Sequence, residues 1–251
     1  MREKFVYAEL PRTGLCNMLF PWARAVLFAR DSGCAMIAPQ WVKIHRIGPW
    51  LRGEVDKRYY FNQFTNEGYI KGVRRLLTLA FCRSRVRAFK GIGAGFDEIY
   101  QEADYLRGEL LRIASADIVR RLDAMSNPYI AIHVRRGDFA RTGQSLDERY
   151  YIRALRAAKE MCGRDLPALV FSDAPDEEIA YLIKGFKDVH RAERAPALLD
   201  LLALSRAEVL VGTNNSTFSL WGAFLGKGTS LWAKEMLPMR GRRRLKGMLQ
   251  V

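Results

Sequence analysis

The chain has 251 residues, of which 49% are hydrophobic and 27% charged, and this composition is typical of a globular protein. It carries 41 Lys and Arg against 27 Asp and Glu, a formal net charge of +14 that indicates an anionic partner: a phosphorylated small molecule, an acidic membrane or a nucleic acid. No apolar run approaches the roughly 20 residues of a membrane span. The N-terminus also lacks the apolar core of a signal peptide, so we expect a cytoplasmic protein.

Neither cysteines nor histidines form a metal-binding pattern. Cys16, Cys34, Cys82 and Cys162 lie far apart with no CxxC spacing, which favours free thiols. The three histidines show no metal-ligand spacing, and the chain contains no Asp-x-Asp sequence, the usual metal–diphosphate anchor. We therefore expect no cofactor and no metal.

The N-terminal half begins with a predicted strand at residues 4–10, a loop and a helix at 18–33, in which Pro21 is tolerable only in the first turn. A second strand follows at 34–39. Between Gln40 and Ile113 no period is sustained, so loops and short helices that shape an acceptor surface are expected there. A helix over 113–125 leads into the second half.

The C-terminal half alternates strands with helices, the pattern of a parallel sheet built from βαβ units. Ser145 is the predicted N-cap of the first helix, with Glu148 completing a capping box. The predicted strands cover 129–134, 168–173, 188–192, 208–212 and 229–233, and the predicted helices cover 145–164, 174–186, 196–207 and 216–226. The sequence thus predicts an α/β protein of two Rossmann-type lobes with a cleft between them, at 1–125 and 126–233.

Two stretches of the C-terminal half carry anion-binding chemistry. Arg135 and Arg136 follow a buried strand, at the end where open α/β sheets place their ligands, and a guanidinium suits a phosphate. Ser216 and Thr217 open a helix directly after another strand, so free backbone amides face outward there. Together they predict a diphosphate clamp. Asp173, at a third strand end, is placed to pair with a base that presents two donors, as guanine does.

Each of these residues has an alternative structural role. The alternative role of the two arginines is an ion pair with Asp138 or with a glutamate of the next helix, and Asp138 itself suits a turn cap or a general base. Asp173 also suits the start of the following helix, and His133 a buried core position. Core positions are predicted for most of the aromatic series Phe218, Trp221 and Phe224, and a loop for Gly91 to Gly95.

The motifs "HVRRGDF", "FSD", "LLALSRAEVLVGTNNSTFSLWGAFLG" and "TGLCNMLFPWARA" resemble those of the α-1,2-fucosyltransferases, glycosyltransferase family eleven. The resemblance implies a GT-B-like fold whose C-terminal lobe binds the nucleotide, and an inverting, metal-independent transfer of L-fucose from GDP-fucose to a glycan hydroxyl. By position the resemblance places Arg135 on the β-phosphate with Arg136 close by, and His133 and Asp173 at the guanosine. It places Ser216, Thr217 and Phe218 on the phosphate side. Gly14 and Asn17 are expected to face the fucose.

From the residues and the resemblance together we predict Arg135, Asp138 and Asn17 as the catalytic residues. The expected acceptor is galactose, through an α-1,2 linkage, in a surface polysaccharide or its lipid-linked precursor. Cys16 and Met18 depart from the family motif, which leaves open a transferase that uses another nucleotide sugar. An inactive relative that only binds the donor is a further alternative.

Two basic clusters remain. Arg83, Arg85, Arg87 and Lys90 form one. The other is a basic amphipathic tail at 234–251, expected to make a peripheral contact with the inner, anionic face of a membrane. Its members are Arg240, Arg242, Arg243, Arg244 and Lys246, with Met236, Leu237, Met239, Leu245, Met248 and Leu249 between them. A nucleic-acid-binding protein is the alternative from another class, but no known binding module is visible and we expect no nucleic acid.

Overall fold

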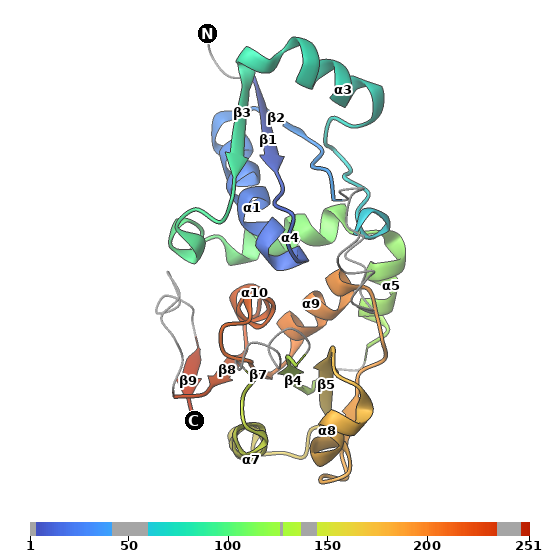
Figure 1. Cartoon of the computed structure of the whole chain (residues 1–251), viewed down its shortest axis with the longest axis vertical. Helices are drawn as coiled ribbons and strands as arrows, with labels where there is room; N and C mark the ends of the chain where they lie inside the picture. The colour runs from blue at the N-terminus through green and yellow to red at the C-terminus, as the bar shows by residue number, and fades with distance from the viewer. Residues whose placement is uncertain (1–3, 42–59, 126–127, 137–144, 235–246) are drawn as a thin grey trace. The chain divides into compact units, whose positions relative to one another are not determined.

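The computed structural model describes residues 4–41, 60–125, 128–136, 145–234 and 247–251 (Figure 1). The chain forms two compact units, Met1–Val119 and Arg120–Val251. The helix α5 (Ala116–Asp123) spans the division between them. None of the described helices combines the length and hydropathy that crossing a membrane requires.

The N-terminal unit is built on a three-stranded parallel sheet in the order β2-β1-β3. Its strands are β1 (Phe5–Glu9), β2 (Ala35–Ile37) and β3 (Val86–Lys90). The helices are α1 (Leu15–Ser32), α3 (Gly72–Phe81) and α4 (Ala103–Ile113), with 3₁₀ turns at Phe61–Gln63, Arg83–Arg85 and Gly95–Glu98. The strand at 4–10, the helix that follows it and the second strand are therefore as predicted.

Pro21 does not lie in the first turn of its helix, contrary to the prediction. Because α1 begins at Leu15, the proline lies in the helix interior and cannot donate to the carbonyl of Asn17. Burial offsets this cost, since eleven of the 18 residues of α1 are buried, among them Leu19, Phe20 and Trp22. Packing of α1 in the core of this unit therefore outweighs the unfavourable position of Pro21 within the helix.

The region from Gln40 to Ile113 contains more regular structure than its sequence indicates. The described part includes α3, α4 and the strand β3. None of the five side chains of β3 is fully buried, so its sequence "VRAFK" lacks a buried strand's apolar run. The strand is recognisable only through its pairing with β1 along all five residues.

The C-terminal unit is a six-stranded parallel sheet in the order β6-β5-β4-β7-β8-β9. Its strands are β4 (Ile130–Val134), β5 (Ala168–Ser172), β6 (Val189–Arg191), β7 (Val209–Val211), β8 (Thr229–Trp232) and β9 (Met248–Gln250). Its helices are α7 (Glu148–Cys162), α8 (Asp176–Ile183), α9 (Ala197–Arg206) and α10 (Thr217–Leu225). Helices cover both faces of the sheet, α7 and α8 on one and α9 and α10 on the other (Figure 1). This is the predicted Rossmann arrangement.

Two details of this unit differ from the prediction. The N-cap of α7 is Asp147, whose carboxylate accepts the N–H of Arg149 at 2.9 Å, and Ser145 lies two residues before it. The sheet also gains an edge strand, because β9 pairs with β8 in parallel register. Met248 and Leu249, expected in an amphipathic tail, therefore belong to the sheet, and the tail arginines lie outside the described residues.

Candidate functional site

The order of the strands identifies where a ligand binds in the C-terminal unit. From β4 the chain proceeds through α7 to β5 and β6 on one side, whereas from β7 it proceeds through α10 to β8 on the other. The connections that leave the carboxyl ends of β4 and β7 therefore diverge. In open α/β sheets a crevice forms at such a switch point, and nucleotides bind there.

Thr213, directly beyond the carboxyl end of β7, joins the two diverging strands. Its hydroxyl donates to the carbonyl of His133 at 2.6 Å and accepts the N–H of Arg135 at 3.1 Å. The same oxygen lies 2.9 Å from the hydroxyl of Tyr151 on α7. Because the one threonine proton is used toward His133, Tyr151 donates in this contact. Thr213 thereby fixes the backbone from which Arg135 projects.

Arg135 is oriented by Asp173, which follows β5. One terminal nitrogen of the guanidinium lies 2.8 Å from Asp173 Oδ2, and both side chains are about one-third exposed, at 31% and 29%. The other carboxylate oxygen of Asp173 accepts the backbone N–H of Arg136 at 2.9 Å. Both oxygens of Asp173 thus contact the arginine pair, and the ion pair of Arg135 is with Asp173, a partner that the sequence did not indicate.

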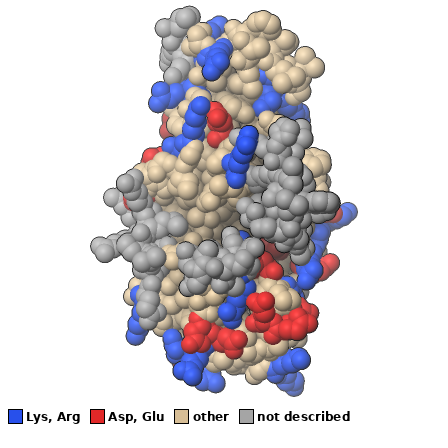
Figure 2. Space-filling view, in the orientation of Figure 1, with Lys and Arg blue, Asp and Glu red and all other residues tan. Residues whose placement is uncertain are grey.

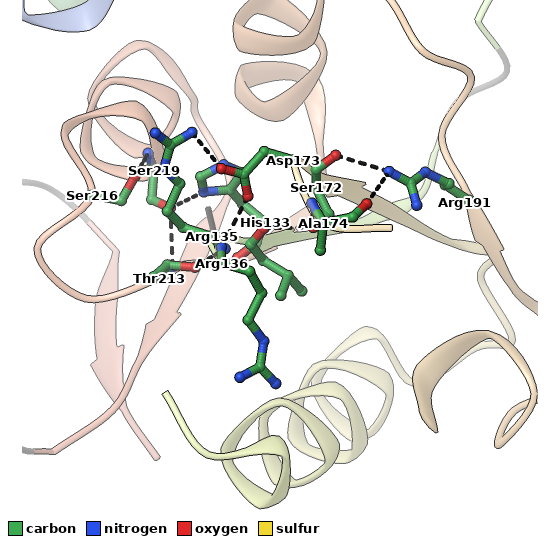
Figure 3. A network of polar contacts seen from close by, with 11 residues as sticks. His133, Arg135, Arg136, Ser172, Asp173, Ala174, Arg191, Thr213, Ser216 and Ser219 are labelled. Atoms are coloured by element: carbon green, nitrogen blue, oxygen red, sulfur yellow. Dashed lines mark hydrogen bonds and ion pairs between the residues drawn. The ribbon is translucent and has the colours of Figure 1, made fainter. Parts of the chain in front are cut away.

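The two guanidinium groups point in different directions. Figure 3 shows Arg135 directed toward Asp173 and the start of α10, and Arg136 directed toward α7. Arg136 Nη2 lies 3.8 Å from a carboxylate oxygen of Glu148, in the first turn of α7. Of the two arginines, Arg135 is therefore the one whose side chain lies beside the helix N-terminus.

His133 is buried on the sheet face that α10 covers. Its Nδ1 lies 2.6 Å from the hydroxyl of Ser219, and its ring centroid lies 5.2 Å from that of Phe218. Burial, with a smaller contribution from the positive charge of Arg135, lowers the pKa of His133 to about 3. The imidazole is therefore neutral at neutral pH. Since Ser219 Oγ already accepts the N–H of Thr213 at 3.0 Å, we assign its proton to Nδ1, which leaves the imidazole proton on Nε2.

The turn between β7 and α10 presents a helix N-terminus at the switch point. Ser216 caps α10 by accepting the N–H of Ser219 at 3.4 Å, as predicted, and Asn215 adopts a left-handed backbone with φ of 61°. The first turn of α10 contains no acidic side chain, so its dipole favours an anion. Thr217 and Phe218 lie in this first turn and are half-buried.

A further arginine braces the loop that carries Asp173. Arg191, the last residue of β6, donates through Nη2 to the carbonyl of Ser172 at 3.1 Å and to that of Ala174 at 2.7 Å (Figure 3). Its Nη1 pairs with Asp176 at the start of α8. The two carbonyls flank Asp173, so Arg191 fixes the backbone from which that carboxylate projects.

The structure gathers most of the predicted site residues in one place. His133, Arg135, Asp173, Ser216, Thr217 and Phe218 lie around the carboxyl ends of β4, β5 and β7. Arg136 joins them through its backbone, and Asp138 lies outside the described residues. Gly14 and Asn17 belong to the N-terminal unit, as the N-cap and in the first turn of α1, and their contact with fucose stays a prediction.

Sequence reasoning missed the supporting residues Thr213, Ser219, Tyr151 and Arg191. A hydroxyl that directly follows a predicted strand, as Thr213 does, is a usable signal. Ser219 stands three residues after the helix-capping Ser216, the spacing of one helical turn. Tyr151 and Arg191 gave no such signal, because their contacts depend on how the strands are ordered.

Three comparisons relate the chain to known proteins. The model of glycosyl transferase family 11 matches residues 50–238, which is most of the chain. The chain belongs to glycosyltransferase family 11. It is therefore a glycosyltransferase, and the resemblance drawn from the motifs is confirmed. The search of curated proteins gave no match.

Solved structures similar to this family 11 protein include the fucosyltransferases NodZ and POFUT1. Fucosyltransferase NodZ from Bradyrhizobium is 18% identical, covers 90% of this chain and 94% of its own, and gives a TM-score of 0.57. POFUT1 in complex with GDP is 13% identical, covers 92% of this chain and 98% of its own, and gives a TM-score of 0.59. At such identities the likeness concerns the fold, and the predicted GT-B-like class, a mixed α/β fold with parallel sheets, is confirmed.

Proposed function

We propose that this family 11 glycosyltransferase transfers L-fucose from GDP-fucose to a glycan hydroxyl with inversion and without a metal. The observation that carries the proposal is Arg135, held beside the N-terminus of α10 at the switch point of a Rossmann unit. The relatives support the choice of donor, since NodZ was also obtained soaked with GDP-fucose, at 17% identity, 90% and 93% coverage and a TM-score of 0.56.

The proposed chemistry is a displacement at the anomeric carbon of fucose. An acceptor oxygen forms a bond to that carbon while the bond to the β-phosphate oxygen breaks, and the electron pair leaves with GDP. Arg135 and the amides at the start of α10 stabilise the negative charge that develops on the phosphate. The proton of the acceptor hydroxyl passes to a base, and Asp138 is our candidate, with a turn-capping role as its alternative. Asn17 and Gly14 are proposed to contact the fucose.

Guanosine recognition is assigned to His133 and Asp173. In the assigned tautomer His133 presents Nε2–H as a donor, while Ser219 occupies Nδ1. Asp173 accepts from the Arg136 backbone and pairs with Arg135, so its contact with guanine would use the remaining lone pairs of the carboxylate.

Among the described residues no cluster of three or more His, Cys, Asp or Glu is placed to bind a metal ion.

The alternative of a different donor sugar rested on Cys16 and Met18. Both side chains are buried in α1, with 3% and 1% exposure. They pack inside the N-terminal unit, so their departure from the family motif changes the core. These two departures therefore give no reason to prefer another donor sugar. Galactose as the acceptor, the α-1,2 linkage and a surface polysaccharide or its lipid-linked precursor remain part of the proposal.

Thermal unfolding with GDP, GDP-fucose, GDP-mannose, UDP and dTDP, each with and without EDTA, tests the donor. A ligand at a hundred times its dissociation constant stabilises the folded protein by about 2.7 kcal/mol, which raises the melting temperature measurably. A GDP-specific rise that survives EDTA is expected. A rise with UDP or dTDP alone would exclude a guanosine donor.

The phosphate role of Arg135 is tested by Arg135→Ala, with Arg153→Ala as the matched control. Arg153 is exposed on α7 in the same unit, so both variants lose one positive charge. Transfer of fucose should fall at least a hundredfold in the Arg135 variant, as when one oxyanion-stabilising donor is lost, and stay unchanged in the control. Activity within a few-fold of the wild type in Arg135→Ala contradicts the assignment.

A further inference from the structure

The helix α3 in the N-terminal unit presents its apolar side chains to solvent. Their exposed fractions are 72% for Val73, 60% for Leu76, 51% for Leu77 and 82% for Phe81. At 3.6 residues per turn these positions, with Ala80, occupy one face of the helix. We call this set of five residues the outer face of α3.

The opposite side of α3 packs onto the unit through polar groups. Arg75 donates through Nε to the carbonyl of Ala38 at 2.8 Å and through Nη2 to the hydroxyl of Tyr7 at 3.1 Å. Thr78 is buried and its hydroxyl donates to the carbonyl of Arg74 at 2.8 Å. A helix of a soluble protein normally turns its apolar stripe inward. In α3 the stripe is turned outward, so folding of the described chain does not explain it.

The surroundings of the outer face are strongly basic. The stretch from Gly68 to Phe96 contains seven Lys and Arg residues and no Asp or Glu. Among them Lys71, Arg74 and Arg83 are exposed, and no ion pair joins them to a described carboxylate. In Figure 2 the end of the N-terminal unit that carries α3 shows uncharged and basic atoms, while acidic atoms gather over the C-terminal unit.

We propose that the outer face of α3 is a docking surface for an anionic lipid bilayer. Apolar side chains flanked by exposed basic residues fit the boundary between headgroups and acyl chains. The apolar side chains enter the acyl layer, and the basic side chains meet the lipid phosphates. With ten residues, α3 is about 15 Å long, so it lies in the plane of the membrane and does not cross it. This surface is distinct from the C-terminal tail, for which membrane contact was predicted from the sequence.

The test is co-sedimentation of the full chain with vesicles of phosphatidylglycerol and phosphatidylcholine, compared with phosphatidylcholine alone. It needs neither donor nor acceptor, so its result is independent of the proposed transfer reaction. Binding to the anionic vesicles that weakens at high salt is expected. The apolar contribution is tested with Leu76→Ser/Leu77→Ser, which should lower the partition coefficient at least tenfold. The substitution Met161→Ser, at a 45% exposed methionine on α7, should leave it unchanged.

The basic contribution is tested with Arg74→Gln/Arg83→Gln against Arg153→Gln/Arg156→Gln. Both pairs are exposed and both remove two charges, but the second pair lies on α7. Since one basic residue near an anionic surface contributes about fivefold in partition, the first pair should weaken binding about 30-fold and the second should not. Circular dichroism checks that each variant is folded.

Any one of the following outcomes would overturn the proposal. The first is a wild-type chain that ignores the anionic vesicles at low salt. The second is an equal loss of binding in the α7 control pair, or a loss with Arg242→Gln/Arg243→Gln/Arg244→Gln in the tail while the α3 variants still bind. The third is a wild-type dimer in light scattering that becomes a monomer in Leu76→Ser/Leu77→Ser, which would assign the outer face to a second copy of the chain.

Discussion

The substitution Thr213→Val tests whether one hydroxyl holds the phosphate side of the site together. Valine keeps the shape of threonine but replaces the hydroxyl by a methyl group. Three contacts of Thr213 Oγ1 are lost, to the carbonyl of His133, the N–H of Arg135 and the hydroxyl of Tyr151. Thr213 is completely buried, so water cannot replace them.

The magnitude follows from these contacts. A typical intramolecular hydrogen bond contributes about 1 kcal/mol net, so three lost bonds cost about 3 kcal/mol. The added buried methyl group returns about 0.8 kcal/mol. The unfolding free energy of Thr213→Val should therefore fall by about 2 kcal/mol. Because the backbone of Arg135 loses its anchor, affinity for GDP should fall as well, about tenfold.

Urea unfolding of a double-mutant cycle with Tyr151→Phe measures the contact directly. In the wild type Tyr151→Phe removes a bonded hydroxyl and should cost about 1 kcal/mol. In the Thr213→Val background that hydroxyl has already lost its threonine partner, so the same change should cost nothing or stabilise. Additive effects of the two substitutions would refute the reasoning. Thr213→Ser, which keeps the hydroxyl, should retain the affinity for GDP.

Three further predictions concern neighbouring residues. In calorimetry Asp173→Asn should weaken binding of GDP more than binding of inorganic pyrophosphate, because the carboxylate is proposed to contact guanine as well as to orient Arg135; equal losses for the two ligands would contradict the guanine contact. Ser219→Ala, which removes the partner of His133 Nδ1 and of a buried N–H, should lower the unfolding free energy measured in urea by about 2 kcal/mol; ¹⁵N spectra should show the Nε2–H tautomer in the wild type and a changed tautomer population in the variant. Because the pKa of His133 is lowered to about 3 in the folded protein and is about 6.5 in the unfolded chain, only the unfolded chain binds a proton between these values, so stability falls as pH falls. From pH 6 to pH 5 the wild type should lose about 1 kcal/mol more unfolding free energy than His133→Asn, and parallel curves would contradict the buried neutral imidazole.

Much of the C-terminal unit could be predicted because its strands are buried on both faces. All five residues of β4 are buried, and such continuous apolar runs are visible in a single sequence. The arginines after β4 and the serine that caps α10 were found in the same way, since strand ends and helix starts are local features. The family was predicted from the resemblance of these motifs, and the match of the family model confirmed it.

What could not be predicted depends on contacts between distant segments. Arg191 acts on the loop after β5 only because β6 pairs with β5, and β9 joins the sheet only because β8 offers it an edge. Gly212 is a further case. A side chain there would lie 2.7 Å from the ring of Trp232, on the neighbouring strand β8. Without the strand order these residues are unremarkable in the sequence.

Neutral groups shape the anion site as much as charged side chains do. The +14 charge indicates an anionic partner but does not say where it binds, because exposed arginines are spread over both units. Arg135 is fixed through its N–H by Thr213 and through its guanidinium by Asp173, and it lies beside the N-terminus of α10 (Figure 3). A fixed guanidinium loses less entropy when it meets a phosphate, and it acts together with amides that are already aligned at the start of α10. An anion site in this fold is therefore identified by the buried hydroxyls that hold an arginine, and the overall charge contributes mainly to attracting the ligand.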